Sequence, residues 1–210
     1  MDEQFWHRKW ASNEIAFHEG APNRLMLAHI GRLGLAPGSR VFVPLCGKSL
    51  DLHWLLAQGH RVAGIELSRL AIDQLFASLG VTPMVSSAGE LLHYHAQDID
   101  IFVGDIFSLS GELLGAVDAV YDRAALVALP EPMRAPYAAH VTHLARQAPQ
   151  LLICYQYDQA IMAGPPFSIG DEEVRQRYGH AYALTLLDKA EVAGGFKGRF
   201  PALEAVWLLA

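Results

Sequence analysis

The sequence predicts an α/β protein whose mainly parallel sheet is covered by helices on both faces. Short strand-like runs alternate along the chain with segments of helical periodicity, and this alternation is typical of right-handed strand–helix–strand units. The length of 210 residues favours one domain. We find no repeat, low-complexity segment or linker that would divide residues 1–210.

Composition excludes several classes of protein. Apolar residues make up 52% and charged residues 18% of the chain, the opposite of the balance that extended disorder requires. The net charge of −6 provides no basic surface for nucleic acid. No apolar run approaches the roughly 18 residues of a membrane span, and the acidic N-terminus is unlike a signal peptide. Two cysteines cannot build a disulfide framework. We therefore expect a cytoplasmic monomer that binds neither nucleic acid nor membranes.

The alternation is clearest in the first half of the chain. A compact apolar run follows the turn Pro37-Gly38, and a second one follows Gly59. Leucines spaced three and four residues apart separate the two runs, and a longer apolar stripe begins after Ser68, a favourable N-cap, and stops at Gly80. These patterns predict strands at 40–44 and 61–66 and helices at 51–58 and 68–80.

The second half continues the alternation. Apolar runs predict further strands at 99–103, 117–121, 151–157, 181–187 and 202–209, with a small hairpin strand at 91–96. Helical stretches are expected at 124–129 and 132–144. A glycine-rich connection containing Gly194, Gly195 and Gly198 joins the last two strands.

An N-terminal block precedes the alternation. It carries four aromatic side chains and then a predicted helix at 22–33, with Pro22 at a favourable first helical position. One interpretation is a helix that caps the sheet. The other is a lid, over about residues 1–34, that covers the crevice where such folds bind ligands. The aromatic residues are Phe5, Trp6, Trp10 and Phe17.

The turn after the first strand reads Val43-Pro44-Leu45-Cys46-Gly47-Lys48. It is not a phosphate-binding P-loop, because Phe42 stands where that motif needs a glycine, and it lacks the three glycines of a dinucleotide fingerprint. A nucleoside without phosphates needs only one close backbone approach, which Gly47 allows. Glu66 follows 19 residues later, at the end of the second strand, where a carboxylate can accept hydrogen bonds from ribose hydroxyls. This pattern favours S-adenosylmethionine over a nicotinamide cofactor; an unliganded, solvated Glu66 is the alternative.

Two further strand ends face the same crevice. Asp105 and Ile106 follow the third strand and offer a polar and an apolar contact for adenine, although an ordinary Gly-Asp turn also explains them. Arg123 follows the strand predicted at 117–121. Its guanidinium could pair with Asp105 or Asp122, or instead bind a ligand carboxylate or stabilise a thiolate.

Other candidate sites have simpler explanations. His93 and His95 alternate on a strand and so point to one face, but we identify no third ligand and expect no metal site. Cys46 is expected to be a small buried apolar residue. The stiff loop 164–167 either projects Phe167 towards a ligand or merely turns the chain.

Taken together, these motifs resemble the thiopurine S-methyltransferase family, of the bacterial type. The resemblance rests on Trp10, Phe17-His18, the turn at 43–48 and Gly64-Ile65-Glu66, and it continues through 104–107, 121–128 and 164–167. It implies a Rossmann-like methyltransferase fold of about seven strands, with one strand of the last hairpin antiparallel. It covers nearly the whole chain.

The resemblance also implies roles for individual residues. It assigns S-adenosylmethionine binding to Trp10, Leu45, Glu66 and Arg123 beside Gly47, with Asp105 and Ile106 near adenine. It places Phe17 against an aromatic acceptor. The loop position of Phe167 and the charge of Arg123 predict a further acceptor contact and a group that orients the acceptor thiolate. An arginine near the acceptor in the longer mammalian loop has no clear counterpart, and Lys197 and Arg199 are the available cations.

The function implied is methyl transfer to the sulfur of aromatic or heterocyclic thiols by in-line displacement. Selenium or tellurium acceptors are an alternative, as is a binding module without catalysis. A nicotinamide-dependent dehydrogenase is disfavoured by the missing glycine triplet.

Overall fold

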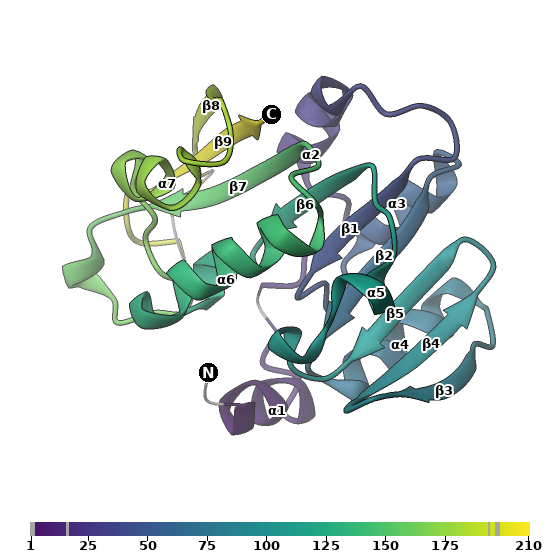
Figure 1. Ribbon diagram of the computed structural model, residues 1–210. Helices are drawn as coiled ribbons and strands as arrows, with labels where there is room; N and C mark the ends of the chain where they lie inside the picture. Colours follow the sequence, from purple (N-terminus) through teal and green to yellow (C-terminus); the bar gives the residue numbers. More distant parts are fainter. Residues whose placement is uncertain (1–2, 16, 193, 196–197) are drawn as a thin grey trace.

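A computed structural model of the protein describes residues 3–15, 17–192, 194–195 and 198–210. Nine strands form one sheet in the order β3-β4-β5-β2-β1-β6-β7-β9-β8 (Figure 1). Their bounds are β1 Arg40–Pro44, β2 Arg61–Glu66, β3 Met84–Ala88, β4 Leu91–Ala96, β5 Ile99–Val103, β6 Ala119–Arg123, β7 Gln150–Gln156, β8 Leu184–Glu191 and β9 Leu203–Leu209.

The centre of the sheet is parallel. β2 pairs with β1 and β5, and β6 pairs with β1 and β7, all in the parallel sense. Antiparallel pairing is confined to the two edges, where β4 lies between β3 and β5 and β9 lies between β7 and β8. The predicted parallel α/β fold is confirmed, although the sheet has nine strands instead of about seven.

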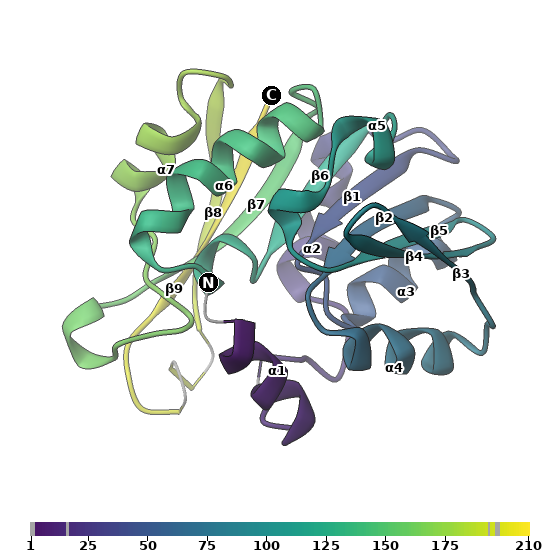
Figure 2. The same cartoon turned by 60° about the horizontal axis from the view of Figure 1, so that its bottom comes forward.

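Helices cover both faces of this sheet, as Figures 1 and 2 show. Successive residues of β1 point to opposite faces. Phe42 belongs to the core cluster that includes residues of α6 and α7, whereas Val41 and Val43 belong to the cluster that includes residues of α2, α3 and α4. The helices are α1 Glu3–Ala11, α2 Arg24–His29, α3 Leu50–Ala57, α4 Arg69–Leu79, α5 Gly111–Leu114, α6 Glu131–Leu144 and α7 Asp171–Tyr178. Single 3₁₀ turns are η1 Ile30–Leu33, η2 Ile106–Ser108, η3 Leu126–Ala128 and η4 Gln159–Ile161.

Several predicted bounds differ from the structure. The predicted helix at 22–33 begins later, because Asn23 is its N-cap and its side chain accepts hydrogen bonds from the N–H groups of Leu25 and Met26. Pro22 therefore lies outside α2. The strand predicted at 117–121 is β6, which runs two residues further and ends at Arg123 itself. The helix predicted at 124–129 is only the 3₁₀ turn η3.

The sequence did not predict β3, α7 or the four-residue helix α5, because the apolar pattern of each is weak or short. β3 is an edge strand whose residues are mostly exposed, so no alternation of buried and exposed positions marks it. α7 has only Val174 and Tyr178 buried among its eight residues.

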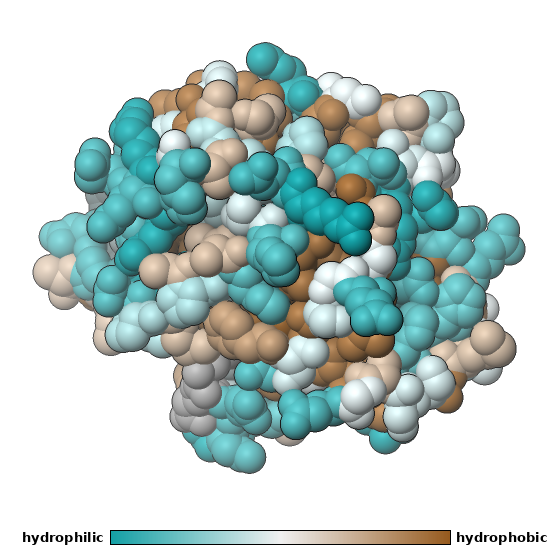
Figure 3. Space-filling view, in the orientation of Figure 1, coloured by the Kyte–Doolittle hydropathy of each residue, from teal (hydrophilic) through white to brown (hydrophobic). Residues whose placement is uncertain are grey.

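The surface agrees with this arrangement. Figure 3 shows a largely hydrophilic surface on the side of α6, with apolar residues visible in a strip near its centre. Among the described residues, no helix combines the length and the apolar character that a transmembrane segment would need.

Candidate functional site

A pocket lies at the carboxyl ends of the parallel strands β1, β2 and β5, where folds of this class bind ligands. It contains four of the residues that the sequence analysis assigned to the cofactor: Leu45, Glu66, Asp105 and Ile106. The other residues that line it are Glu3, Ile65, Leu67 and Gly104. Except for Glu3 of α1, all of these residues lie at or directly after the carboxyl ends of three neighbouring strands, so the topology explains their convergence.

The turn after β1 is tight and is fastened to β2. Leu45 and Gly47 adopt left-handed backbone conformations, with φ of 49° and 53°. Leu45 is a non-glycine residue in this region, a conformation that is uncommon and is concentrated at functional sites. The Cys46 N–H donates to the carbonyl of Ile65 at 3.0 Å. The turn therefore presents its backbone to the pocket in a defined geometry.

Glu66 is the anchor of this turn. Its carboxylate is buried and accepts hydrogen bonds from the backbone N–H of Gly47 at 3.0 Å and of Ser68 at 2.8 Å, one at each oxygen. Burial raises the pKa of Glu66, and the backbone hydrogen bonds oppose that effect. Each carboxylate oxygen keeps further acceptor capacity. Glu66 thus combines a structural role with the chemistry needed to accept hydrogen bonds from a diol.

Trp10 reaches the same turn from α1. Its side chain is buried, and a Cβ added at Gly47 would lie 3.1 Å from its ring, so the missing side chain of Gly47 makes this close approach possible. The ring centroid of Phe17 lies 5.5 Å from that of Trp10 in an edge-on contact, and Trp6 contacts Phe17 in the same way. Figure 2 shows α1 beyond one end of the sheet, and Glu3 of this helix lines the pocket. The N-terminal aromatic residues therefore lie beside the candidate cofactor site.

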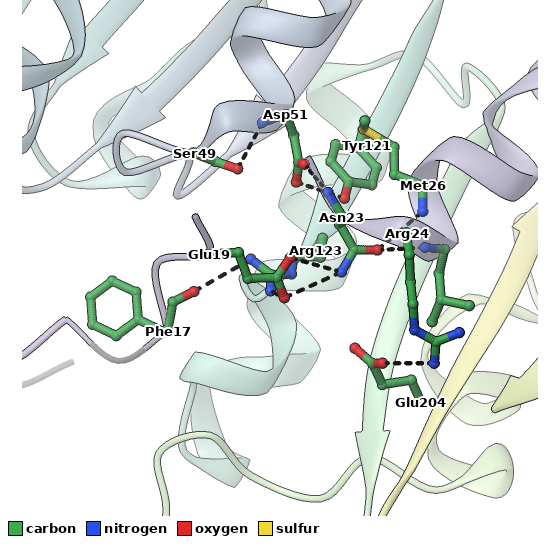
Figure 4. Close-up of polar contacts among 11 residues, drawn as sticks. Phe17, Glu19, Asn23, Arg24, Met26, Ser49, Asp51, Tyr121, Arg123 and Glu204 are labelled. Atoms are coloured by element: carbon green, nitrogen blue, oxygen red, sulfur yellow. Dashed lines mark hydrogen bonds and ion pairs between the residues drawn. The ribbon is translucent and has the colours of Figure 1, made fainter. Parts of the chain in front are cut away.

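Arg123 ends β6, and its side chain is only 8% exposed. It donates to the carbonyl of Phe17 at 3.5 Å and forms an ion pair with Glu19 (Figure 4). Burial lowers the pKa of Arg123, but Glu19 together with Tyr121, Tyr155 and Asp51 outweighs this and raises the pKa above its ordinary value. Arg123 therefore remains charged inside the fold.

Glu19 also belongs to a longer chain of hydrogen bonds. Its carboxylate accepts from the side-chain amide of Asn23, whose backbone N–H donates to Asp51 at 2.7 Å. The other oxygen of Asp51 accepts from the hydroxyl of Tyr121 at 2.9 Å. This network, drawn in Figure 4, connects the segment before α2 with α3 and β6.

The partner of Arg123 differs from the two that the sequence analysis considered. Asp105 is exposed and caps the 3₁₀ turn η2 by accepting from the N–H of Phe107. Asp122 accepts from the hydroxyl of Tyr137 and from the N–H of Leu126. Glu19 was missed because only its neighbours Phe17 and His18 carried a recognisable motif.

Other candidates lie elsewhere. The ring of Phe167 lies 5.1 Å from the guanidinium of Arg134, and its N–H donates to the carbonyl of Val127. Its contact with an acceptor stays a prediction. Arg199 is exposed, and Lys197 lies outside the described residues. Cys46 is buried, as predicted, and burial raises the pKa of its thiol well above the ordinary value.

Comparison with known proteins identifies close relatives. Residues 1–201 match the family model described as thiopurine S-methyltransferase. The curated thiopurine S-methyltransferase of Xanthobacter autotrophicus is 54% identical over 210 residues, covering 100% of this chain and 99% of the relative. That of Teredinibacter turnerae is 51% identical over 209 residues, covering 100% and 97%.

Solved structures with the same fold are more distant in sequence. The 1,6-didemethyltoxoflavin-N1-methyltransferase of Burkholderia thailandensis, solved with bound S-adenosylhomocysteine, superposes with a TM-score of 0.68 at 16% identity, covering 99% of this chain and 87% of that one. The magnesium protoporphyrin IX methyltransferase of Synechocystis has a TM-score of 0.58 at 16% identity, covering 98% and 99%. These similarities establish the methyltransferase fold.

Proposed function

Because this chain belongs to the thiopurine S-methyltransferase family and its cofactor is therefore S-adenosylmethionine, we propose that it methylates the sulfur of aromatic or heterocyclic thiols. The observation that carries this proposal is the convergence of Leu45, Glu66, Asp105 and Ile106 on one pocket next to Trp10 and Gly47. The sequence motifs and the lining of this pocket both support the proposal.

The residues of the pocket fit the cofactor. Glu66 would accept hydrogen bonds from the ribose hydroxyls, and its charge would strengthen them. Ile106 is buried and Asp105 is exposed, so this pair would hold the adenine between an apolar contact and a polar edge. Leu45 would cover the ribose side of the pocket from the turn after β1. When bound, S-adenosylmethionine supplies a methyl group that its positive sulfonium already activates.

Trp10 would form an aromatic wall near the sulfonium. The face of an indole ring attracts cations, and in the structure the ammonium of Lys48 lies 5.9 Å from the Trp10 ring centroid. The ring position therefore suits a positive group. Trp10 and Phe17 would also exclude water from the reacting atoms, which supports the lid interpretation of the N-terminal segment.

Arg123 would orient the acceptor. It is a buried cation beside the Trp10–Phe17 pair, and the backbone carbonyl of Phe17 accepts one of its hydrogen bonds. A guanidinium in this position favours the thiolate over the thiol, because it lowers the cost of the negative charge. The methyl transfer then depends mainly on alignment of the two sulfur atoms, and the protein supplies this by positioning.

A turnover assay with labelled S-adenosylmethionine tests the proposal. We expect label transfer to an aromatic thiol and little or none to the phenol of the same shape. Transfer to selenols or tellurite, but not to thiols, would replace the thiol proposal with a metalloid acceptor. Cofactor binding without transfer to any of these acceptors would support a non-catalytic binding module instead.

A further inference from the structure

Three side chains that can ligate a metal converge on the surface of the β4–β5 hairpin. His93 and His95 alternate on β4 and face the same side, and Asp100 of β5 is directly opposite His95 in the antiparallel register. Spacing along the sequence identifies no third ligand for the two histidines, but the structure places Asp100 beside them. The possible ligand atoms of the three residues all lie within 4.8 Å of one another.

The distances approach those of a coordination sphere. Nε2 of His93 lies 2.9 Å and Nδ1 of His95 lies 2.8 Å from the same oxygen, Oδ1 of Asp100. In a tetrahedral site with metal–ligand bonds of about 2.0–2.1 Å, ligand atoms are separated by about 3.3 Å. If both nitrogen–oxygen distances lengthened by roughly half an ångström, an ion could replace the protons of these two hydrogen bonds.

The surrounding residues hold two of these groups in place. The ring of His93 is stacked on Phe102, with centroids 4.7 Å apart and planes 12° apart. The guanidinium of Arg40 donates to Oδ2 of Asp100 at 3.1 Å, which leaves Oδ1 directed at the histidines. The Asp100 carboxylate is thus oriented by an outer partner, as metal ligands commonly are.

We propose that His93, His95 and Asp100 bind one late first-row divalent cation, of which zinc is the probe of choice. Two imidazoles and one carboxylate suit such ions and do not suit magnesium or calcium, which prefer oxygen ligands. The side chains of the three residues are 27%, 47% and 24% exposed, so an ion can enter from solvent and complete its coordination with water. The site lies near the amino end of β5, at the opposite end of that strand from the cofactor pocket. Its role is to join β4 to β5.

Titration of the tag-free protein with zinc tests this site without any measurement of activity. We expect one equivalent to bind, thermal stability to rise with zinc concentration, and magnesium to have no such effect. His95→Ala and Asp100→Asn should each weaken zinc binding at least about tenfold. Cobalt should give the visible absorption of a low-symmetry site in the wild-type protein only.

His143→Ala is the matched control, because His143 is also exposed and lies on α6. It should leave zinc affinity unchanged. Asp100→Asn also changes the partner of Arg40. His95 is the most exposed of the three ligands, so His95→Ala tests the site without that change. Zinc binding equal in the wild-type protein and His95→Ala would overturn the proposal and leave a hydrogen-bonded cluster only. A loss of zinc affinity in His143→Ala equal to that in His95→Ala would also overturn the proposal.

Discussion

The carboxylate of Glu19 forms an ion pair with the guanidinium of Arg123, across 104 residues of sequence. Glu19 comes from the segment between α1 and α2, whereas Arg123 ends β6 beside the candidate active site. The pair therefore fastens the N-terminal segment to the carboxyl edge of the sheet. It also gives the buried cation of Arg123 a compensating charge, which a buried guanidinium requires.

Replacement of Glu19 should destabilise the protein. Glu19→Ala leaves Arg123 buried without its carboxylate partner, and loss of one partner of a buried pair is costly. Because the side chain of Glu19 is 39% exposed, solvent screening reduces the effect to about 1 kcal/mol. Urea unfolding without ligand measures it. Glu14→Ala removes a more exposed ion pair with Lys9 and should have no measurable effect; equal unfolding curves for the two variants would contradict the role of Glu19.

Replacement of Glu66 should weaken cofactor binding. Glu66→Ala removes the acceptor for the ribose and for the N–H groups of Gly47 and Ser68. Hydrogen bonds to a charged acceptor contribute roughly 1.5–3 kcal/mol each, so affinity for S-adenosylmethionine should fall at least tenfold. Calorimetry measures this directly. Glu112→Ala, at an exposed position of α5, is the control, and unchanged affinity in Glu66→Ala would exclude Glu66 from the site.

Removal of residues 1–17 should separate the two interpretations of the N-terminal segment. If the segment is a lid, the truncated protein should fold but lose most of its turnover and some cofactor affinity, because Trp10 and Phe17 no longer shield the reacting atoms. Circular dichroism, turnover and calorimetry report the three properties. A truncated protein with full activity would rule out the lid, and one that cannot fold would favour the capping role.

Asp122 should make stability depend on pH. Burial raises its pKa from an ordinary value of 3.8 to about 6, and the hydroxyl of Tyr137 and the N–H of Leu126 only partly oppose this. Between these values the folded protein keeps a proton that the unfolded chain has released, so the free energy of unfolding should fall as pH rises from about 4 to about 6. The difference corresponds to about 3 kcal/mol.

Asp122→Asn provides the control for this pH dependence. Its amide can still accept from Leu126 and donate to the Tyr137 oxygen, so the fold should persist. The difference in unfolding free energy between Asp122→Asn and the wild-type protein should change with pH across this range, because other titrating groups are common to both. A constant difference from pH 4 to pH 7 would show that Asp122 does not titrate there.

Local patterns in the sequence determined much of the fold. Buried strands such as β1 and β2 are continuous apolar runs with turn residues beside them, and their predicted bounds agree with the structure. The helix α4 begins at the predicted cap Ser68, whose hydroxyl accepts from the N–H of Ala71, and it ends at Gly80 in the left-handed conformation. Such signals involve residues only a few positions apart, so they can be recognised without the tertiary structure.

The sequence by itself also determined which residues line the candidate cofactor pocket. Leu45, Glu66 and Asp105 follow successive parallel strands, and the carboxyl ends of such strands meet at one edge whatever the packing of the helices. Only the tertiary structure decided that Arg123 pairs with Glu19, that Phe167 lies against Arg134, and that Asp100 completes the cluster with His93 and His95. These contacts depend on side-chain direction and on how separate elements pack, and neither property is encoded in the spacing of residues along the chain.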